Sequence, residues 1–353
     1  MESLSDVRRL LEDRRDRLTR IEVQTDAIGL DDDGRLRVDG QSFALGPDAR
    51  KVITGWAKIP DEFFANLRPE IQKFLFARLY ADSAADVIRA QKLHRRSGLI
   101  VEDGSRCVGI VDPSLAHPPG LAVLTATLAA KPDNIDETQL EVPHCRLNGE
   151  VHVSVISRTF KTEVRTGDVV YAGIDIRHSD HGAFATQIES YMYRLVCTNG
   201  MLMKVCRHIG TVPSRLRRPA AHNPDRMMHQ IQAMARAAWT ELDAKIEAVR
   251  LLAEERVDKR ADLVRSIAEK LRFPERLVKD IVQALEEDEH APSGTLWDII
   301  GAVSRVGTHS DRLSSATRRF LQELSGDLIF ERVHRCPTCG RSDLRQRRLL
   351  PRR

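Results

Sequence analysis

The strongest constraint in the sequence is a stretch of alternating residues that predicts a half-buried β-strand. Its apolar positions are Val170, Ala172, Ile174 and Ile176. Between them lie Tyr171, Gly173 and Asp175, and the same alternation occurs at 150–163, where His152 and Ser154 separate valines. Because successive side chains of a strand point to opposite faces, these segments predict a sheet with one covered face and one polar face.

Helical patterns surround this β-rich centre. Residues 3–21 carry apolar side chains at helical spacing among many charges, and 48–86 predicts helices that restart at Pro60 and Pro69. Residues 120–130 predict a buried helix, and 225–255 predicts one helix of about 30 residues, followed by four shorter ones. A hairpin is expected around Asp103-Gly104 and a turn at Asn199-Gly200, whereas 183–189 fits a helix or a strand.

These patterns together predict an α+β fold. We expect a central, mostly antiparallel sheet flanked by helices, with a helical C-terminal unit and a small CxxC tail. The expected divisions are an N-terminal helical layer with a short hairpin at 1–97, a β-rich core at 98–222, a helical C-terminal unit at 223–326 and a cysteine-containing basic tail at 327–353.

Composition excludes several classes of protein. The chain has 353 residues, of which 42% are hydrophobic and 30% charged, as in ordinary soluble proteins. No apolar run reaches the roughly 18 residues that span a bilayer, and the N-terminus lacks the apolar region of a signal peptide. We therefore expect a cytoplasmic protein without a membrane partner, and the scattered cysteines fit a reducing compartment.

Basic residues gather in one stretch that follows the predicted strands. The net charge is +4, and the stretch includes Arg207, Arg215, Arg217 and Arg218. Arginine makes bidentate contacts with phosphate, and Tyr171, Tyr191 and Tyr193 could stack on unpaired bases. The alternative is that the arginines are solvated and the tyrosines belong to the core. The first interpretation predicts a nucleic-acid-binding surface formed by this stretch with Tyr171 and Tyr193.

The C-terminal tail contains a zinc-knuckle motif. Two residues separate Cys336 from Cys339, the spacing at which two thiolates reach one metal ion, and His334 is a candidate third ligand. A tetrahedral Zn²⁺ site needs about four ligands, so the fourth would come from elsewhere in the chain or from a second subunit. The alternative is a reducible thiol pair. Homo-oligomers could form through this tail or through the 225–255 helix.

Two other segments allow a functional interpretation beside an ordinary structural one. His178, Asp180 and His181, with Asp175 nearby, could form the metal site of a hydrolase, although the spacing also suits a plain turn. Residues 263–286 allow a helix-turn-helix with its turn at Phe273-Pro274, as any pair of packed helices would.

Three segments carry a resemblance to a known family. They are Gly167-Asp168 with the strand and turn that follow, Tyr193 to Met201 (YRLVCTNGM), and Thr295 to Ser304 (TLWDIIGAVS). Over roughly residues 45–325 the chain resembles a family found on phages, plasmids and genomic islands, domain of unknown function 932. It departs from that family at His178, Gly301 and Ser304. The resemblance implies a mobile-element setting and brings no activity, cofactor or catalytic residue.

We therefore expect a nucleic-acid-binding accessory protein of a phage, plasmid or genomic island. Single strands are its candidate ligand, and we expect a binding protein before an enzyme. The alternatives are a metal-dependent nuclease and a protein-interaction factor such as an inhibitor of host defence. A nuclease requires acidic and histidine side chains that converge in a cleft. An interaction factor requires no affinity for nucleic acid.

The tail motif predicts bound zinc. Purified protein should contain zinc, and the Cys336→Ser variant should lose it, because one thiolate of the pair is removed. Metal analysis of both proteins by mass spectrometry measures this. Absence of zinc from the unsubstituted protein would contradict the assignment.

Overall fold

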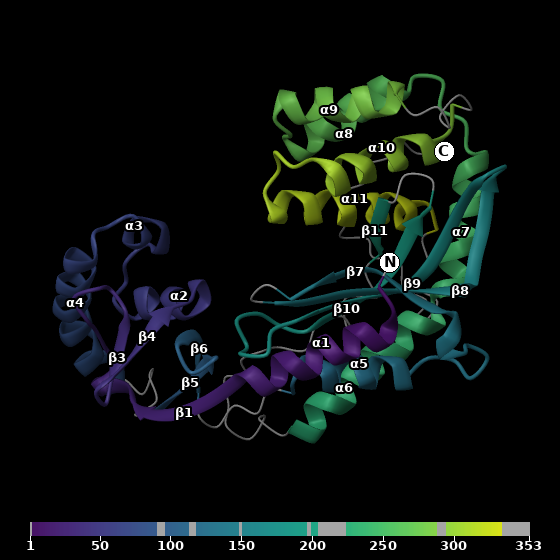
Figure 1. Ribbon diagram of the computed structural model, residues 1–353. Coiled ribbons are helices and arrows are strands. Elements are labelled where there is room, and N and C mark those ends of the chain that lie inside the picture. Colours follow the sequence, from purple (N-terminus) through teal and green to yellow (C-terminus); the bar gives the residue numbers. More distant parts are fainter. Residues whose placement is uncertain are drawn as a thin grey trace.

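The computed structural model of the protein describes residues 2–89, 96–112, 118–147, 150–195, 199–203, 224–287 and 294–333. Within these residues the chain forms a six-stranded sheet, a five-stranded sheet and the helices that cover them (Figure 1). The α+β fold expected from the sequence is confirmed. No helix in these ranges combines the length and apolar character needed to cross a membrane.

The six-stranded sheet lies at one end of the molecule (Figure 1). Its strands are β1 (Leu18–Gln24), β2 (Gly29–Leu30), β3 (Leu36–Val38), β4 (Gln41–Leu45), β5 (Arg96–Glu102) and β6 (Arg106–Val111), in the order β1-β5-β6-β4-β3-β2. Helices α2 (Pro47–Trp56), α3 (Asp61–Ala65) and α4 (Pro69–Arg89) cover it, and the last two start beside Pro60 and at Pro69, as expected. Phe43, Ile53, Phe64 and Leu99 are buried in the core between them.

The hairpin of β5 and β6 belongs to this first sheet. Strand β5 pairs with β1, and β6 pairs with β4 in the sheet's one parallel contact. The expected boundary at residue 97 therefore cuts through the six-stranded sheet instead of separating two units. Alternation of apolar residues identifies a strand, but it does not identify the strand's partner, which is set by packing far along the chain.

The five-stranded sheet is antiparallel throughout. Its strands are β7 (Leu140–Arg146), β8 (Val151–Arg165), β9 (Asp168–His178), β10 (Gln187–Arg194) and β11 (Asn199–Met203), in the order β11-β10-β9-β8-β7. Residues 187–189, which fit either a helix or a strand, lie in β10. Asn199 pairs with Arg194 and Gly200 pairs with Tyr193, so the expected turn at Asn199-Gly200 is the start of β11. Strand pairing overrides the local turn preference of this dipeptide.

Four helices cover the apolar face of the five-stranded sheet. They are α1 (Leu4–Arg17), α5 (Gly120–Ala129), α6 (Pro224–Thr240) and α7 (Leu242–Glu254). We expected an exposed amphipathic helix here. Instead, Leu4, Val7 and Leu11 of α1 are buried in the larger core. The helix also ends at Arg17, and the residues after it form β1.

The expected helix over 225–255 is two helices that meet at Glu241. The buried amine of Lys245 lies 2.8 Å from Glu241 and donates to Ser190 Oγ of the sheet at 2.8 Å, which ties α7 to β10. The apolar side chains of both helices, including Ile231 and Val249, pack in the protein's own core. This face is therefore not available for the homo-oligomer considered above.

The remaining helices occur where the sequence predicts them. They are α8 (Arg260–Leu271), α9 (Glu275–Glu286), α10 (Leu296–His309) and α11 (Ser315–Val333). Helices α8 and α9 are joined by a turn in which Arg272 has a left-handed φ of 56° and Pro274 caps the second helix. Helix α10 begins with a capping box of Thr295 and Asp298. Whether α8 and α9 recognise a duplex stays a prediction.

A buried ion pair joins the sheet to α10. Arg194 Nε and Nη2 donate to the two carboxylate oxygens of Asp168, each at 2.7 Å, and Trp297 Nε1 donates to Asp168 Oδ2 at 3.1 Å. The Asp168 and Arg194 side chains are each 1% exposed. A β-carbon at Gly301 would lie 2.7 Å from Arg194 Nη1, so the small residue leaves room for the guanidinium. The three segments that carry the family resemblance therefore meet at one structural contact.

The ion pair predicts a large stability loss when one partner is removed. Asp168→Ala leaves the Arg194 guanidinium buried without its carboxylate, and such changes cost about 3–5 kcal/mol of unfolding free energy. Glu247→Ala removes an exposed ion pair on α7 and should change stability by less than about 0.5 kcal/mol. Urea unfolding followed by circular dichroism compares them. Equal midpoints for the two variants would contradict the structural role.

Candidate functional site

A polar pocket lies on the face of the five-stranded sheet opposite the covering helices α5 to α7. Its volume is about 670 Å³, within the range of small-ligand sites. Strands β7 to β10 form its floor, and the end of α10 and the first half of α11 form one wall. Side chains from Tyr191, Tyr193 and the half-exposed Phe320 are the aromatic part of its lining.

The floor of the pocket contains two parallel rows of polar residues, because the strand register places them opposite one another. The first row is Arg146 on β7, His152 on β8, Arg177 on β9 and Gln187 on β10. Directly opposite residues on one sheet face have their β-carbons about 4.5–5.5 Å apart, so these side chains interact. His152 thus lies between two arginines.

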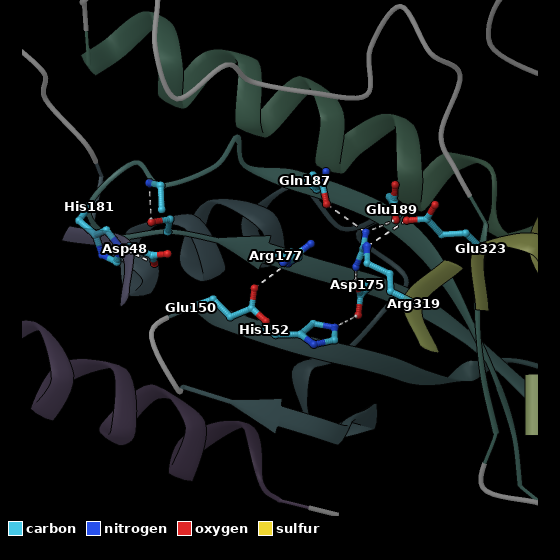
Figure 2. A network of polar contacts seen from close by, with 12 residues as sticks. Asp48, Glu150, His152, Asp175, Arg177, His181, Gln187, Glu189, Arg319 and Glu323 are labelled. Atoms are coloured by element: carbon cyan, nitrogen blue, oxygen red, sulfur yellow. Dashed lines mark hydrogen bonds and ion pairs between the residues drawn. The ribbon is translucent and has the colours of Figure 1, made fainter. Parts of the chain in front are cut away.

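The second row is the next set of neighbours along the same strands. It consists of His144, Ser154, Asp175 and Glu189 in the same strand order. Ser154 Oγ donates to Asp175 Oδ1 at 2.6 Å, and His144 contacts His152 edge-on with ring centroids 4.5 Å apart. The two rows therefore form one continuous polar network, most of which is drawn in Figure 2.

Asp175 orients His152. The Nε2 atom of His152 lies 2.9 Å from Asp175 Oδ1, and the carboxylate is buried while the imidazole is 19% exposed (Figure 2). Although burial alone would raise it, His152, Arg319 and Ser154 hold the pKa of Asp175 below its ordinary value, so the group is ionised. An ionised carboxylate only accepts hydrogen bonds, so His152 Nε2 carries a hydrogen and Nδ1 has the lone pair in the neutral ring.

Arg319 of α11 neutralises Asp175 and Glu189, the two carboxylates of the second row. It contacts Glu189 at 2.9 Å, Glu323 at 2.9 Å and Asp175 at 3.7 Å (Figure 2). Its Nη2 also donates to Gln187 Oε1 at 3.0 Å, whereas its buried Nη1 makes no hydrogen bond to the residues that the structure describes. Arg319 therefore ties α11 to the acidic side chains of β9 and β10.

The two arginines of the first row lie at least partly exposed to solvent. Arg146 is exposed and makes no ion pair within the described part of the chain. Arg177 Nε donates to Glu150 at 2.7 Å, and its guanidinium lies 4.6 Å above the Phe184 ring. Partial burial in the pocket, with His152 nearby, lowers the pKa of His144 to about 4, although part of the residue is exposed. His144 is therefore uncharged at neutral pH.

Of the two tyrosines predicted to belong to a nucleic-acid surface, Tyr193 is 8% exposed and Tyr171 is half-buried. Tyr193 packs with Ile156 and Tyr191, which is 6% exposed, in a small cluster that Tyr171 borders. Burial raises the pKa of Tyr191 above its ordinary value, and the Asp175 carboxylate adds to the effect. Tyr193 therefore has no open stacking face, because its ring packs on Tyr191, whereas stacking by the half-buried Tyr171 stays a prediction.

Several predicted site residues lie outside the described residues. These are the nucleic-acid candidates Arg207, Arg215, Arg217 and Arg218 and the zinc candidates His334, Cys336 and Cys339. Their assignments stay predictions. In the ranges that the structure describes, no group of three or more His, Cys, Asp or Glu side chains could hold a metal ion.

The turn after β9 joins parts of the fold and shows no hydrolase geometry. Asp180 accepts from Arg14 Nε at 2.7 Å and from the Gly120 backbone at 2.7 Å, and His181 lies 3.1 Å from Asp48 of α2 (Figure 2). His178 is buried between Thr186 Oγ1 and the Pro118 carbonyl. These side chains point to three different partners, so they link α1, α5 and α2 instead of converging on one ion.

The chain matches no family model, and no curated protein or solved structure matches it either. The resemblance to domain of unknown function 932 stays a prediction. The site must be interpreted from its own geometry.

Part of the site could be recognised from sequence and part could not. The alternation at 150–163 and 170–176 assigns His152, Ser154 and Asp175 to one polar face. Arg146 and Arg177 carry no motif, and their place beside His152 depends on strand register. Arg319 lies far along the chain on α11, and only tertiary packing brings it to Asp175.

The buried His178 predicts a pH dependence of stability. Burial lowers the pKa of His178 below its ordinary value despite the nearby Asp180 carboxylate. Below about pH 6.5 the unfolded chain therefore binds a proton that the folded protein resists, and the unfolding free energy falls as the pH decreases.

His178→Gln removes this titration and should flatten the fall in urea midpoint between about pH 7 and 5. His229→Gln, at an exposed position on α6, is the matched control and should keep the original slope. If the His178 variant also kept that slope, the depressed pKa would be refuted.

Proposed function

We propose that the protein binds single-stranded nucleic acid on the polar face of the five-stranded sheet, as an accessory protein of a phage, plasmid or genomic island. The observation that carries this proposal is the row of Arg146, His152 and Arg177 across three neighbouring strands of the pocket floor. Guanidinium groups donate paired hydrogen bonds to phosphate oxygens, and a row of them along a groove suits a nucleic-acid backbone.

The charge of the pocket supports an anionic ligand on its outer side. The carboxylates of Asp175 and Glu189 are buried beneath Arg319, whereas Arg146 is exposed and Arg318 is half-buried in the wall. A phosphate approaching from solvent therefore meets Arg146 and Arg318, while the partly exposed Glu150 and Glu323 are already paired with Arg177 and Arg319. Phe320, which is 43% exposed at the pocket wall, is an accessible ring for an unpaired base.

The position of β11 supports a longer binding surface. Met203, the last residue of β11, pairs with Ser190, which lies between Glu189 and Tyr191 at the pocket. The stretch that contains Arg207, Arg215, Arg217 and Arg218 follows directly in the sequence. We infer that these arginines extend the phosphate-binding row. The resemblance noted above supports the mobile-element setting.

The proposal predicts that Arg146→Ala and Arg177→Ala each weaken binding of a single strand. Each variant should also reduce the slope of log affinity against log salt concentration by about 1, since each phosphate contact releases counterions. Arg265→Ala, an exposed arginine on α8, is the control and should change neither quantity. Fluorescence anisotropy with labelled single-stranded DNA and RNA at several salt concentrations measures both.

The same assay separates the alternatives. Reversing the charges of Arg215, Arg217 and Arg218 together should weaken binding further and flatten the salt dependence. Absence of binding by the unsubstituted protein to any DNA or RNA overturns the proposal and leaves a protein-interaction factor. Cleavage that requires added Mg²⁺ or Mn²⁺ indicates the metal-dependent nuclease instead.

A further inference from the structure

We propose that His152 is a general base that cleaves bound RNA by promoting attack of a ribose 2′-hydroxyl on the adjacent phosphate. This inference rests on the proposed function, because the same row of residues holds the strand. It adds a reaction and a substrate class. Three features of the geometry around His152 support it.

The first observation is the orientation of the imidazole. Asp175 accepts from Nε2, so the lone pair of the neutral ring is on Nδ1. Nδ1 makes no hydrogen bond within the part of the chain that the structure describes, and His152 is part of the pocket lining. A histidine held by a buried carboxylate, with its second nitrogen free of hydrogen bonds to the described residues and its side chain in the pocket lining, is the arrangement of a general base.

The second observation is the rigid support of Asp175. Ser154 Oγ donates to Oδ1 at 2.6 Å, and Arg319 Nη1 lies 3.7 Å from Oδ2. All three residues come from different elements, β9, β8 and α11. A carboxylate fixed in this way holds the imidazole in one tautomer, so Asp175 is a positioning residue for His152.

The third observation is the placement of positive charge. Arg146 and Arg177 lie opposite His152 on the two neighbouring strands. A phosphate bound there meets Arg146 directly and Arg177 in its ion pair with Glu150, so its negative charge is stabilised beside the base. Charge that develops on phosphate oxygens in the transition state is stabilised most by donors already in place.

These groups perform one balanced step. His152 Nδ1 takes the proton of the 2′-hydroxyl while O2′ forms a bond to phosphorus, and the bond from phosphorus to O5′ breaks. Water donates a proton to O5′, and the hydroxide that remains takes the proton from the His152 imidazolium. The products are a 2′,3′-cyclic phosphate end and a 5′-hydroxyl end. DNA lacks the 2′-hydroxyl, so it binds without being cleaved.

The test uses the full chain, a labelled RNA strand and the same strand made entirely of 2′-deoxynucleotides, in buffer containing EDTA. We expect cleavage of the RNA alone, with 2′,3′-cyclic phosphate ends identified by mass spectrometry. His152→Gln, whose amide N–H can still donate to Asp175, should slow cleavage by about 10²-fold or more. Fluorescence anisotropy with the deoxy strand measures any change in binding by this variant separately, so that lost binding is not mistaken for lost chemistry. His229→Gln, purified identically, should cleave at the original rate.

Asp175→Asn tests positioning through the pH profile. Removal of the carboxylate disfavours the imidazolium form, so the acid limb of the cleavage rate should move to lower pH while the rate falls. A role in folding alone would lower the rate without moving that limb. Urea unfolding of the variant measures any loss of stability separately.

The outcomes distinguish the two proposals. Binding of both strands without cleavage overturns this inference and leaves the proposed function standing. Cleavage that survives His152→Gln, or that lacks cyclic phosphate ends, also overturns it. If the protein neither binds nor cleaves either strand, both proposals are overturned. Cleavage that depends on His152 supports the inference even where equilibrium binding is weak.

Discussion

The fold depends on one buried ion pair, which joins an arginine and an aspartate. Arg194 and Asp168 lie at paired ends of β10 and β9, and neither charge could be buried without the other. Trp297 adds α10 to the pair, which fixes the start of that helix against the sheet. The far end of α10 and the helix after it then extend over the polar face. A contact with no catalytic character thus determines where the pocket wall lies.

The two faces of the five-stranded sheet carry different kinds of side chain. One face presents valine and isoleucine to the covering helices, and its burial is the main source of stability in the larger core. The other face carries two polar rows whose charges are balanced by Arg319. Because the rows are part of a sheet, their spacing is set by backbone pairing. Such a scaffold holds side chains more rigidly than loops would.

Local patterns predicted most elements, and long-range contacts account for the differences. The strand at 170–176 and the helices after 260 follow directly from periodicity. The partners of the 98–112 hairpin do not, because pairing with β1 and β4 depends on residues far away in the sequence. The site shows the same division. Alternation assigns Asp175 to a polar face, but its contacts with His152 and Arg319 require the sheet register and the packing of α11.

The place of α1 makes the six-stranded sheet an insertion within the larger unit. Helix α1 belongs to the same core as the segments after residue 118, whereas β1 to β6 lie between them in the chain. The two ends of the insertion are neighbours, since Arg20 Nη2 donates to the Asp112 carbonyl at 3.3 Å. The insertion is thus a connection of about a hundred residues between α1 and the rest of the larger core, and closing such a long loop costs conformational entropy. During synthesis, α1 can therefore pack against the core segments after residue 118 only when the inserted sheet has been synthesised and its two ends lie together.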